Sequence, residues 1–213
     1  MIDKKIRVLL VDDHAVVRNG IRLMLGTVDD IEVKGEAENA QDALRLVREQ
    51  DFDVALVDIA LPDKNGLELL KLLHNDKPKL AVLILSMYAE DIYAVRALKH
   101  GAAGYLTKNS QVATMVAAVR KVAAGGKHLS PALLEKLAGM LSGGSMVPHE
   151  ALSDRELEVL RLLAIGESLV HIAETLHLSP STVTTYRARI LEKTGMKSNA
   201  QLTRYAMENG LLM

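Results

Sequence analysis

Five short aliphatic runs, separated by stretches with helical spacing, constrain the first 124 residues more than any other feature. The runs IRVLLV, IEVKGEA, DVALVDI, LAVLILS and GYLT are predicted strands, and the stretches 14–26, 40–50, 66–75, 91–100 and 111–124 are predicted helices. Strands separated by single helices form βαβ units, in which the strands lie parallel and helices cover both faces. We therefore predict an α/β doubly wound, five-stranded parallel sheet.

Polar residues stand where the predicted strands end. Asp12 and Asp13 end the first strand, Asp58 ends the third, Ser86 ends the fourth and Lys108 follows the fifth. In sheets of this kind, ligands bind at the carboxyl ends of the strands. Three carboxylates that meet there repel one another unless a cation offsets their charge, and Mg²⁺ prefers oxygen ligands. The sequence therefore predicts a Mg²⁺ site at this edge.

The same edge suits a phosphoryl group, because Lys108 supplies a positive charge and Ser86 a hydroxyl donor. The chain has no cysteine and no serine and histidine in register, so the candidate nucleophile is a carboxylate. An aspartate that attacks a phosphoryl group becomes an aspartyl phosphate. Taken singly, the residues leave plainer interpretations open: Asp13 can cap the next helix, and Lys108 and Ser86 can be ordinary loop residues.

The pattern changes after residue 124. SPALLEKLAGML predicts a short helix capped by Ser130, SGGSMVPHEA favours a flexible linker, and four helix signatures follow, at SDRE, 168–177, SPST and SNAQ. The predicted organisation is one domain over residues 1–124, a linker over 125–149 with a short helix at about 131–141, and a small all-α four-helix domain over 150–213.

Positive charge is concentrated near the C-terminus, although the formal net charge is only −1. Against a single acidic residue, positions 179–204 contain five basic ones: Arg187, Arg189, Lys193, Lys197 and Arg204. A tight turn, AETLHLSPST, separates this helix from the one before it, which is the order of a helix-turn-helix. The alternative is a solvated helix whose charges bind nothing.

Helical periodicity assigns roles on this segment. At 100° per residue Val183 and Ile190 turn inward, while small side chains on the opposite face can approach base edges, including the thymine methyl group: Ser181, Thr184, Thr185 and Ala188. Arg189 and Lys193 flank that face and suit DNA phosphates. For Arg187, on the core side, a structural ion pair and a DNA contact both stay open.

The first half of the chain also resembles a known family. VLLVDDH, ALVDIALPDKNG, LILSM and GAAGYLTK are similar to the receiver domain of bacterial response regulators, with its flavodoxin-like fold, over about residues 4–124. The resemblance implies that Asp58 is the phosphoacceptor and a metal ligand, together with the acidic pair and the carbonyl of Ala60. It also implies that Ser86 and Lys108 contact the phosphoryl group and that Tyr105 changes rotamer on activation.

The second half resembles the LuxR-type domain of NarL/FixJ response regulators, over about residues 150–210. The similar segments are LSDRELEVLRLLAIGES, IAETLHLSPSTVTTYRARILEKTGM and NAQLTRYA, and TVTTYRARI looks closest to the GacA-like branch. The chain also departs from that family. Leu169-Val170-His171 stands where Asn-Lys-Glu is frequent, Tyr186 stands where a histidine is common, and Thr184 and Ala188 replace lysines of some members.

The predicted function is a two-component response regulator, a phosphoprotein controlled by a sensor histidine kinase that binds promoter DNA. We expect a homodimer, because one short helix reads few bases. We also expect a cytoplasmic protein, because the apolar run before Asp12 is too short for a signal peptide or a membrane span. The chain would catalyse only its own phosphorylation and dephosphorylation.

Two other functions stay open. One is a carboxylate-type phosphatase acting through Asp58, although Ala60 stands where a second acid would be needed. The other is a protein-binding adaptor whose C-terminal helices bind no DNA. The apolar end of the chain, Leu211 to Met213, is predicted to be either a frayed tail or a dimer contact.

Overall fold

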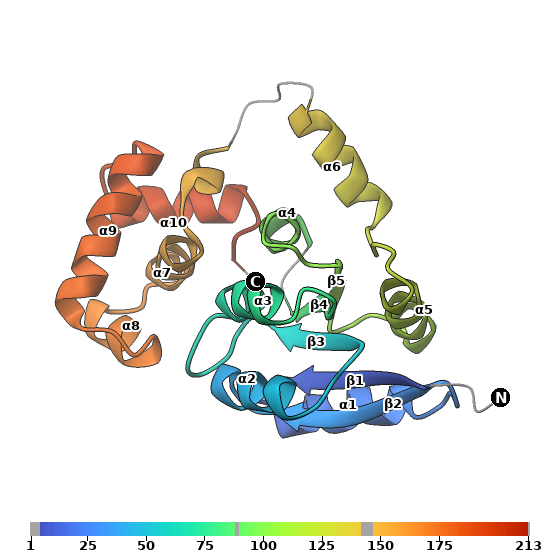
Figure 1. Ribbon diagram of the computed structural model, residues 1–213. Helices are drawn as coiled ribbons and strands as arrows, with labels where there is room; N and C mark the ends of the chain where they lie inside the picture. Colours follow the sequence, from blue (N-terminus) through green and yellow to red (C-terminus); the bar gives the residue numbers. More distant parts are fainter. Residues whose placement is uncertain (1–4, 88–89, 142–146, 213) are drawn as a thin grey trace. The chain divides into compact units, whose positions relative to one another are not determined.

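The computed structural model describes residues 5–87, 90–141 and 147–212. The chain divides into two compact units, residues 1–137 and 138–213, and Figure 1 traces the path through both. Within the described residues, no helix is both long and apolar enough to cross a membrane.

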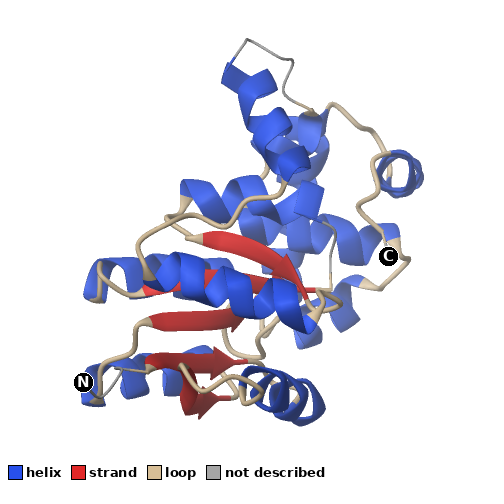
Figure 2. Cartoon of the chain, turned by 90° about the vertical axis from the view of Figure 1, so that its right-hand side faces the viewer, coloured by secondary structure: helices blue, strands red, loops and turns tan. Residues whose placement is uncertain are grey.

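The N-terminal unit is built on a single sheet (Figure 2). Its strands are β1 (Ile6–Val11), β2 (Ile31–Ala37), β3 (Val54–Asp58), β4 (Ala81–Ser86) and β5 (Gly104–Thr107). All neighbours pair in parallel, in the order β2-β1-β3-β4-β5. The predicted α/β doubly wound fold is confirmed, and Asp58 ends the central, wholly buried strand.

Helices cover both faces of this sheet, as Figure 1 shows. Against one face lie α1 (Ala15–Leu25) and α5 (Val112–Ala123), and against the other lie α2 (Ala40–Glu49), α3 (Gly66–Asp76) and α4 (Glu90–Lys99). Alternate strand residues such as Leu10, Leu56 and Leu83 pack with Met115 and Val119 of α5 in one continuous core. Because that core fixes the strands, it also fixes where their carboxyl ends lie.

The loop from β3 to α3 turns back on itself closely. Asn65 Oδ1 accepts the Leu67 N–H at 2.8 Å and so caps α3. The Gly66 N–H donates to the Ile59 carbonyl oxygen, also at 2.8 Å. A Cβ atom on Gly66 would lie 2.0 Å from the carbonyl oxygen of Asp58, so only glycine allows α3 to begin this close to the end of β3.

The described part of the C-terminal half contains helices and no strand. These are α6 (Pro131–Leu141), the 3₁₀ helix η1 (Pro148–Ala151), α7 (Asp154–Ala164), α8 (Leu169–Thr175), α9 (Pro180–Thr194) and α10 (Asn199–Glu208). Each of the last four begins at a serine whose side chain accepts a hydrogen bond from a backbone N–H of the first turn: Ser153, Ser168, Ser179 and Ser198. Gly195, at φ 70°, ends α9 in the left-handed conformation.

Two segments expected to be loose are ordered in the C-terminal unit. Within the predicted flexible linker, η1 buries His149, whose Nδ1 lies 2.8 Å from the hydroxyl oxygen of Tyr205; positions 142–146 lie outside the described residues. Leu211 is fully buried and its carbonyl oxygen accepts the Arg161 Nε–H at 2.7 Å. The prediction of a frayed or partner-bound tail is therefore wrong for Leu211, while Met213 lies outside the described residues.

Candidate metal centre and nucleic-acid interface

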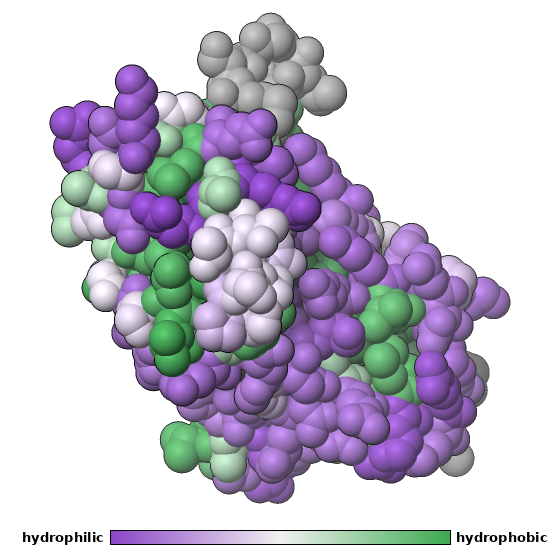
Figure 3. Space-filling view, turned by 90° about the vertical axis from the view of Figure 1, so that its left-hand side faces the viewer, coloured by the Kyte–Doolittle hydropathy of each residue, from purple (hydrophilic) through white to green (hydrophobic). Residues whose placement is uncertain are grey.

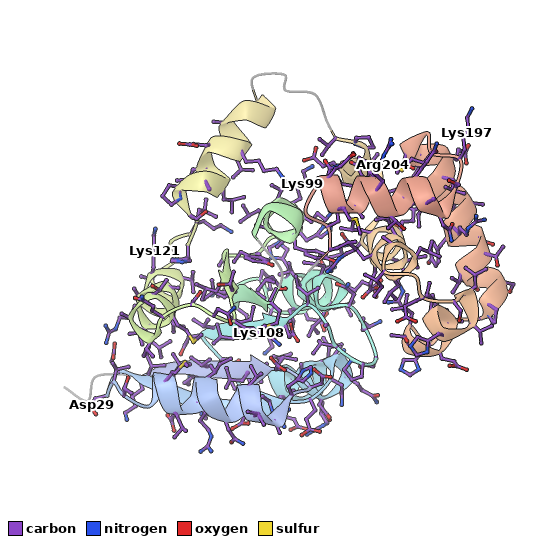
Figure 4. The ribbon with its side chains drawn as sticks, turned by 180° about the vertical axis from the view of Figure 1, so that it is seen from behind. Asp29, Lys99, Lys108, Lys121, Lys197 and Arg204 are labelled. Atoms are coloured by element: carbon purple, nitrogen blue, oxygen red, sulfur yellow. The ribbon has the colours of Figure 1, made fainter. Side chains whose placement is uncertain are left out.

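Lys108, labelled in Figure 4, lies between two carboxylates at the carboxyl ends of β1 and β3 according to its contact distances. Its Nζ is 2.6 Å from Asp12 Oδ2 and 2.7 Å from Asp58 Oδ2. The side chains of Lys108, Asp12 and Asp58 are 6%, 2% and 4% exposed. A buried cation between two buried anions offsets their repulsion and part of their desolvation. The structure therefore brings together residues that stand up to 96 positions apart in the sequence.

Burial controls the protonation of this cluster. It raises the pKa of Asp58 to about 6, against the opposing effects of the Lys108 hydrogen bond and charge. Burial alone would lower the pKa of Lys108, but its close contacts with the carboxylates of Asp12 and Asp58 outweigh burial, and the pKa is raised. Lys108 is therefore cationic at neutral pH, and Asp58 is a carboxylate above about pH 6.

The other residues predicted for this edge lie around the cluster. The Lys108 N–H donates to the Ser86 carbonyl oxygen at 2.8 Å, which places the buried Ser86 beside it at the end of β4. The backbone N–H of Ala60 hydrogen-bonds to Asp58, and its carbonyl remains a predicted metal ligand. Tyr105 is buried on β5, and its change of rotamer remains a prediction.

The donor set suits a divalent cation. Asp12, Asp13, His14 and Asp58 each offer one ligand atom, and these atoms lie within 4.8 Å of one another. Among the described residues, Asp12 Oδ2 has no hydrogen-bond partner although it is buried, since its contact with Lys108 is an ion pair without hydrogen-bond alignment. Carboxylate oxygens in such a partial cage fit Mg²⁺. The plainer interpretation of Asp13 as a helix cap is wrong, because Asp12 Oδ1 accepts the N–H of His14, the N-cap of α1.

Two residues that support the acidic pair escaped the sequence prediction. His14 Nδ1 lies 2.7 Å from Asp13 Oδ1 and 3.3 Å from Asp12 Oδ1. Arg18 is buried, donates to the Asp12 carbonyl oxygen at 2.6 Å and also pairs with Glu38. An arginine on the apolar face of α1 was the available signal, because a buried guanidinium needs carboxylate or carbonyl partners.

The C-terminal unit places α8 and α9 as a helix-turn-helix. Val183 and Ile190 are fully buried, as predicted. The predicted base-facing side chains and both flanking cations are exposed: Ser181, Thr184, Thr185, Ala188, Arg189 and Lys193. Figure 3 views the molecule from the side on which α9 lies in Figure 1 and shows pale, near-neutral residues among hydrophilic ones.

Two basic residues of α9 are bound within the unit. Lys193 Nζ lies 2.6 Å from Oε2 of the buried Glu156 of α7. Burial raises the pKa of Glu156, but the Lys193 hydrogen bond and bonds from Ser153 outweigh it and lower the pKa overall. Arg187 Nε donates to Asn199 Oδ1 of α10 at 2.7 Å. Lys193 therefore joins α9 to α7, and its contact with a DNA phosphate remains a prediction. Arg187 makes a structural hydrogen bond instead of an ion pair.

Comparison with known protein families divides the chain in the same order. Residues 8–120 match the family described as "Response regulator receiver domain". Residues 150–206 match "Bacterial regulatory proteins, luxR family".

Similar proteins share both halves. "Response regulator GacA" of Pseudomonas aeruginosa is 37% identical over 209 residues, which are 97% of this chain and 98% of that protein. "Response regulator UvrY" of Escherichia coli is 33% identical over 208 residues, 97% of this chain and 95% of that protein. Among solved structures, RcsB from Salmonella enterica serovar Typhimurium, bound to promoter rprA with the phosphomimetic BeF₃⁻, is 26% identical at a TM-score of 0.68 and covers 94% of this chain and 98% of its own.

Proposed function

Since this chain belongs to the response regulators that join a receiver domain to a LuxR-type DNA-binding domain, we propose that Asp58 accepts a phosphoryl group from a histidine kinase. The phosphorylated chain then binds promoter DNA as a dimer. The observation that carries this proposal is the Lys108 ammonium, 2.7 Å from Asp58 Oδ2 and 2.6 Å from Asp12 Oδ2. It combines a carboxylate nucleophile with a fixed positive charge.

The transfer needs little from the protein beyond position and charge. An Asp58 carboxylate oxygen forms the new P–O bond as the P–N bond of a kinase phosphohistidine breaks and the imidazole leaves. Lys108 donates to an oxygen of the transferring group, and the Ser86 hydroxyl, at the end of the neighbouring strand, is placed to do the same. Both contacts stabilise negative charge that the buried site would otherwise leave uncompensated.

Asp12, Asp13 and Asp58 would hold the Mg²⁺ that this donor set fits, with the Ala60 carbonyl as a further ligand. When bound, Mg²⁺ supplies positive charge to the phosphoryl oxygens. His14 and Arg18 act through the acidic pair: His14 contacts both carboxylates, and Arg18 holds the Asp12 carbonyl. The protein's part is thus to fix the ligands before the cation arrives.

The proposal extends to the partners and the place of action. RcsB, which shares both halves, binds promoter DNA in the presence of BeF₃⁻, and this supports DNA as the target of α9. We expect the cytoplasm as the location, since the proposed target is DNA. We also expect the chain to catalyse only its own phosphorylation and dephosphorylation, since Ala60 supplies no second acid for turnover of small phosphoesters.

The experiment that tests the switch adds beryllofluoride, a mimic of the aspartyl phosphate, together with Mg²⁺. Light scattering should report a doubled mass, and a fluorescence titration with duplex DNA should report tighter binding in the same sample. Beryllofluoride without Mg²⁺ is the control, because the acidic cluster then lacks its cation. If mass and DNA affinity both stay constant, Asp58 is not the switch; DNA binding that never occurs would favour a protein-binding adaptor.

Arg189→Ala should weaken DNA binding without selecting among sequences. Arg189 is exposed on α9 beside the base-facing residues, so its loss removes about one phosphate contact and lowers the salt slope of log K by about 0.9 per bound chain. Arg204→Ala removes the same charge from α10 and should leave the slope unchanged. Lys193→Ala should instead lower the stability of the C-terminal unit, since the buried Glu156 carboxylate then lacks its cationic partner and keeps the Ser153 N–H. If Arg189→Ala leaves the salt slope of DNA binding unchanged, Arg189 does not contact a phosphate.

A further inference from the structure

On the exposed face of α9, the hydroxyl groups of Thr184 and Thr185 donate hydrogen bonds to backbone carbonyl oxygens of the same helix. Thr184 Oγ1 donates to the Pro180 carbonyl oxygen at 2.9 Å, and Thr185 Oγ1 donates to the Ser181 carbonyl oxygen at 3.0 Å. Threonine in a helix takes this rotamer because its hydroxyl group can then donate to the carbonyl oxygen four residues earlier. Each side chain keeps its methyl group and the lone pairs of its oxygen for contact with a ligand.

The neighbouring groups of this face add no strong donor. Ala188 offers only a methyl group, and Glu192, further along the same exposed side, is an acceptor. The Ser181 hydroxyl pairs with the Ser179 hydroxyl at 2.8 Å. Among the described cations of α9, Arg187 donates to Asn199 and the exposed Lys193 pairs with Glu156, whereas Arg189 is exposed on the flank and forms no ion pair with a described residue.

Base pairs differ in what they offer to such a face. In the major groove an A·T pair presents the thymine methyl group and the adenine N6–H donor, which match methyl groups and acceptor oxygens. A guanine presents two acceptors, N7 and O6, and calls for arginine or lysine donors. The N-terminal residues of a recognition helix are those that reach base edges, and Thr184 and Thr185 lie in the first two turns of α9.

On these grounds, and resting on the proposed DNA-binding function, we propose that Thr184, Thr185 and Ala188 select A·T pairs at the centre of each half-site, through contacts with thymine methyl groups. These three residues are then the specificity-determining residues of the chain. Arg189 contributes affinity from the flank.

The first test selects DNA from a random-sequence duplex pool, with the full chain in Mg²⁺ and beryllofluoride. A·T pairs should be enriched at the centre of each recovered half-site. Recovery of duplexes with G·C pairs at these positions would overturn the inference and leave the DNA-binding function intact. Recovery of no DNA would remove that function, and the inference with it.

The second test removes methyl groups from either partner. One recovered duplex is made with thymine and with uracil at the half-site centres. Wild-type protein should bind the uracil duplex about fourfold more weakly for each contacted methyl group lost, the value of one buried carbon. The variant Thr184→Ser/Thr185→Ser keeps both hydroxyl groups and should bind the two duplexes more nearly alike, the remaining difference being due to Ala188.

A matched control comes from α10. Thr203 Oγ1 donates to the Asn199 carbonyl oxygen at 3.1 Å in the same geometry, so Thr203→Ser removes an equivalent methyl group away from the proposed face. This variant should keep the full preference for thymine over uracil. If wild-type protein binds both duplexes equally, or if the serine variant discriminates as strongly as the wild type does, the methyl groups do not read the sequence.

Discussion

Replacing Asp58 with asparagine is expected to abolish uptake of a phosphoryl group from acetyl phosphate, as measured by intact-mass spectrometry. The amide nitrogen and oxygen of asparagine lack the negative charge of the nucleophile, and no covalent acyl phosphate forms. Asp29→Asn makes the same chemical change at an exposed position and should take up the group as the wild type does. A phosphoryl group still found on the Asp58→Asn protein would overturn the assignment of the acceptor.

The same substitution should stabilise the N-terminal unit at neutral pH. Burial raises the pKa of Asp58 from 3.8 to about 6, so the unfolded chain loses this proton at lower pH than the folded chain does. The stability of the N-terminal unit therefore falls as pH rises from about 4 to about 6, because the folded state must then hold the ionised carboxylate. This loss is constant above about pH 6. The pKa of about 6 already includes the opposing effect of Lys108, so Asp58→Asn should gain about 3 kcal/mol at pH 7 and less than about 1 kcal/mol at pH 4.

Hydrogen exchange of the β1 and β3 amides, in EDTA, measures this difference for the N-terminal unit alone. Wild type and variant are compared at each pH, so that intrinsic exchange rates cancel. Asp29→Asn should stay within about 0.5 kcal/mol of the wild type at every pH. Faster exchange in Asp58→Asn at pH 7 would show that the carboxylate stabilises the fold.

Gly66→Ala is expected to be the most damaging small substitution in the N-terminal unit. The added Cβ would lie 2.0 Å from the Asp58 carbonyl oxygen, and backbone atoms cannot rotate away as a side chain can. The start of α3 must then shift, at a cost of about 3 kcal/mol in the free energy of unfolding. Because the displaced carbonyl belongs to the proposed phosphoacceptor, uptake from acetyl phosphate should slow as well.

Gly20→Ala is the matched control, because nothing lies within 4 Å of the Cβ that it adds to the middle of α1. Alanine there should raise stability by about 0.5 to 1 kcal/mol, since glycine inside a helix loses more entropy on folding. Thermal unfolding of the two variants should therefore shift in opposite directions. Equal stability of Gly66→Ala and the wild type would mean that α3 does not depend on the close approach.

The sequence predicts the sheet and most of its edge because the period of each element decides which residues end a strand. Asp12, Asp58 and Ser86 stand at those ends, and parallel strands bring such ends together. The same reasoning places Val183 and Ile190 inside the C-terminal unit. The periodicity of a single strand or helix is therefore enough to predict whether a side chain points inward or outward.

The periodicity of one helix does not predict which residue of another helix a side chain will contact. Helical periodicity places Lys193 at the border of the exposed face, but its partner Glu156 stands 37 positions earlier on another helix. The capping box of Ser153 and Glu156 is visible in the sequence, whereas the lysine that joins it is not. Likewise, nothing local indicates that His149 meets Tyr205, 56 positions away. Such pairs depend on how helices pack, which a single-helix pattern leaves undetermined.

The contacts that hold α9 have a consequence for how control can work. Ser179 caps its start, Arg187 joins it to α10 and Lys193 joins it to α7. A helix that is capped at its start and joined to two other helices meets the groove pre-organised, so little ordering entropy is lost on binding. Under the proposed function, the phosphoryl group on Asp58 therefore need not reshape α9. The proposed dimer would raise DNA affinity because two linked copies of α9 bind with a high effective concentration.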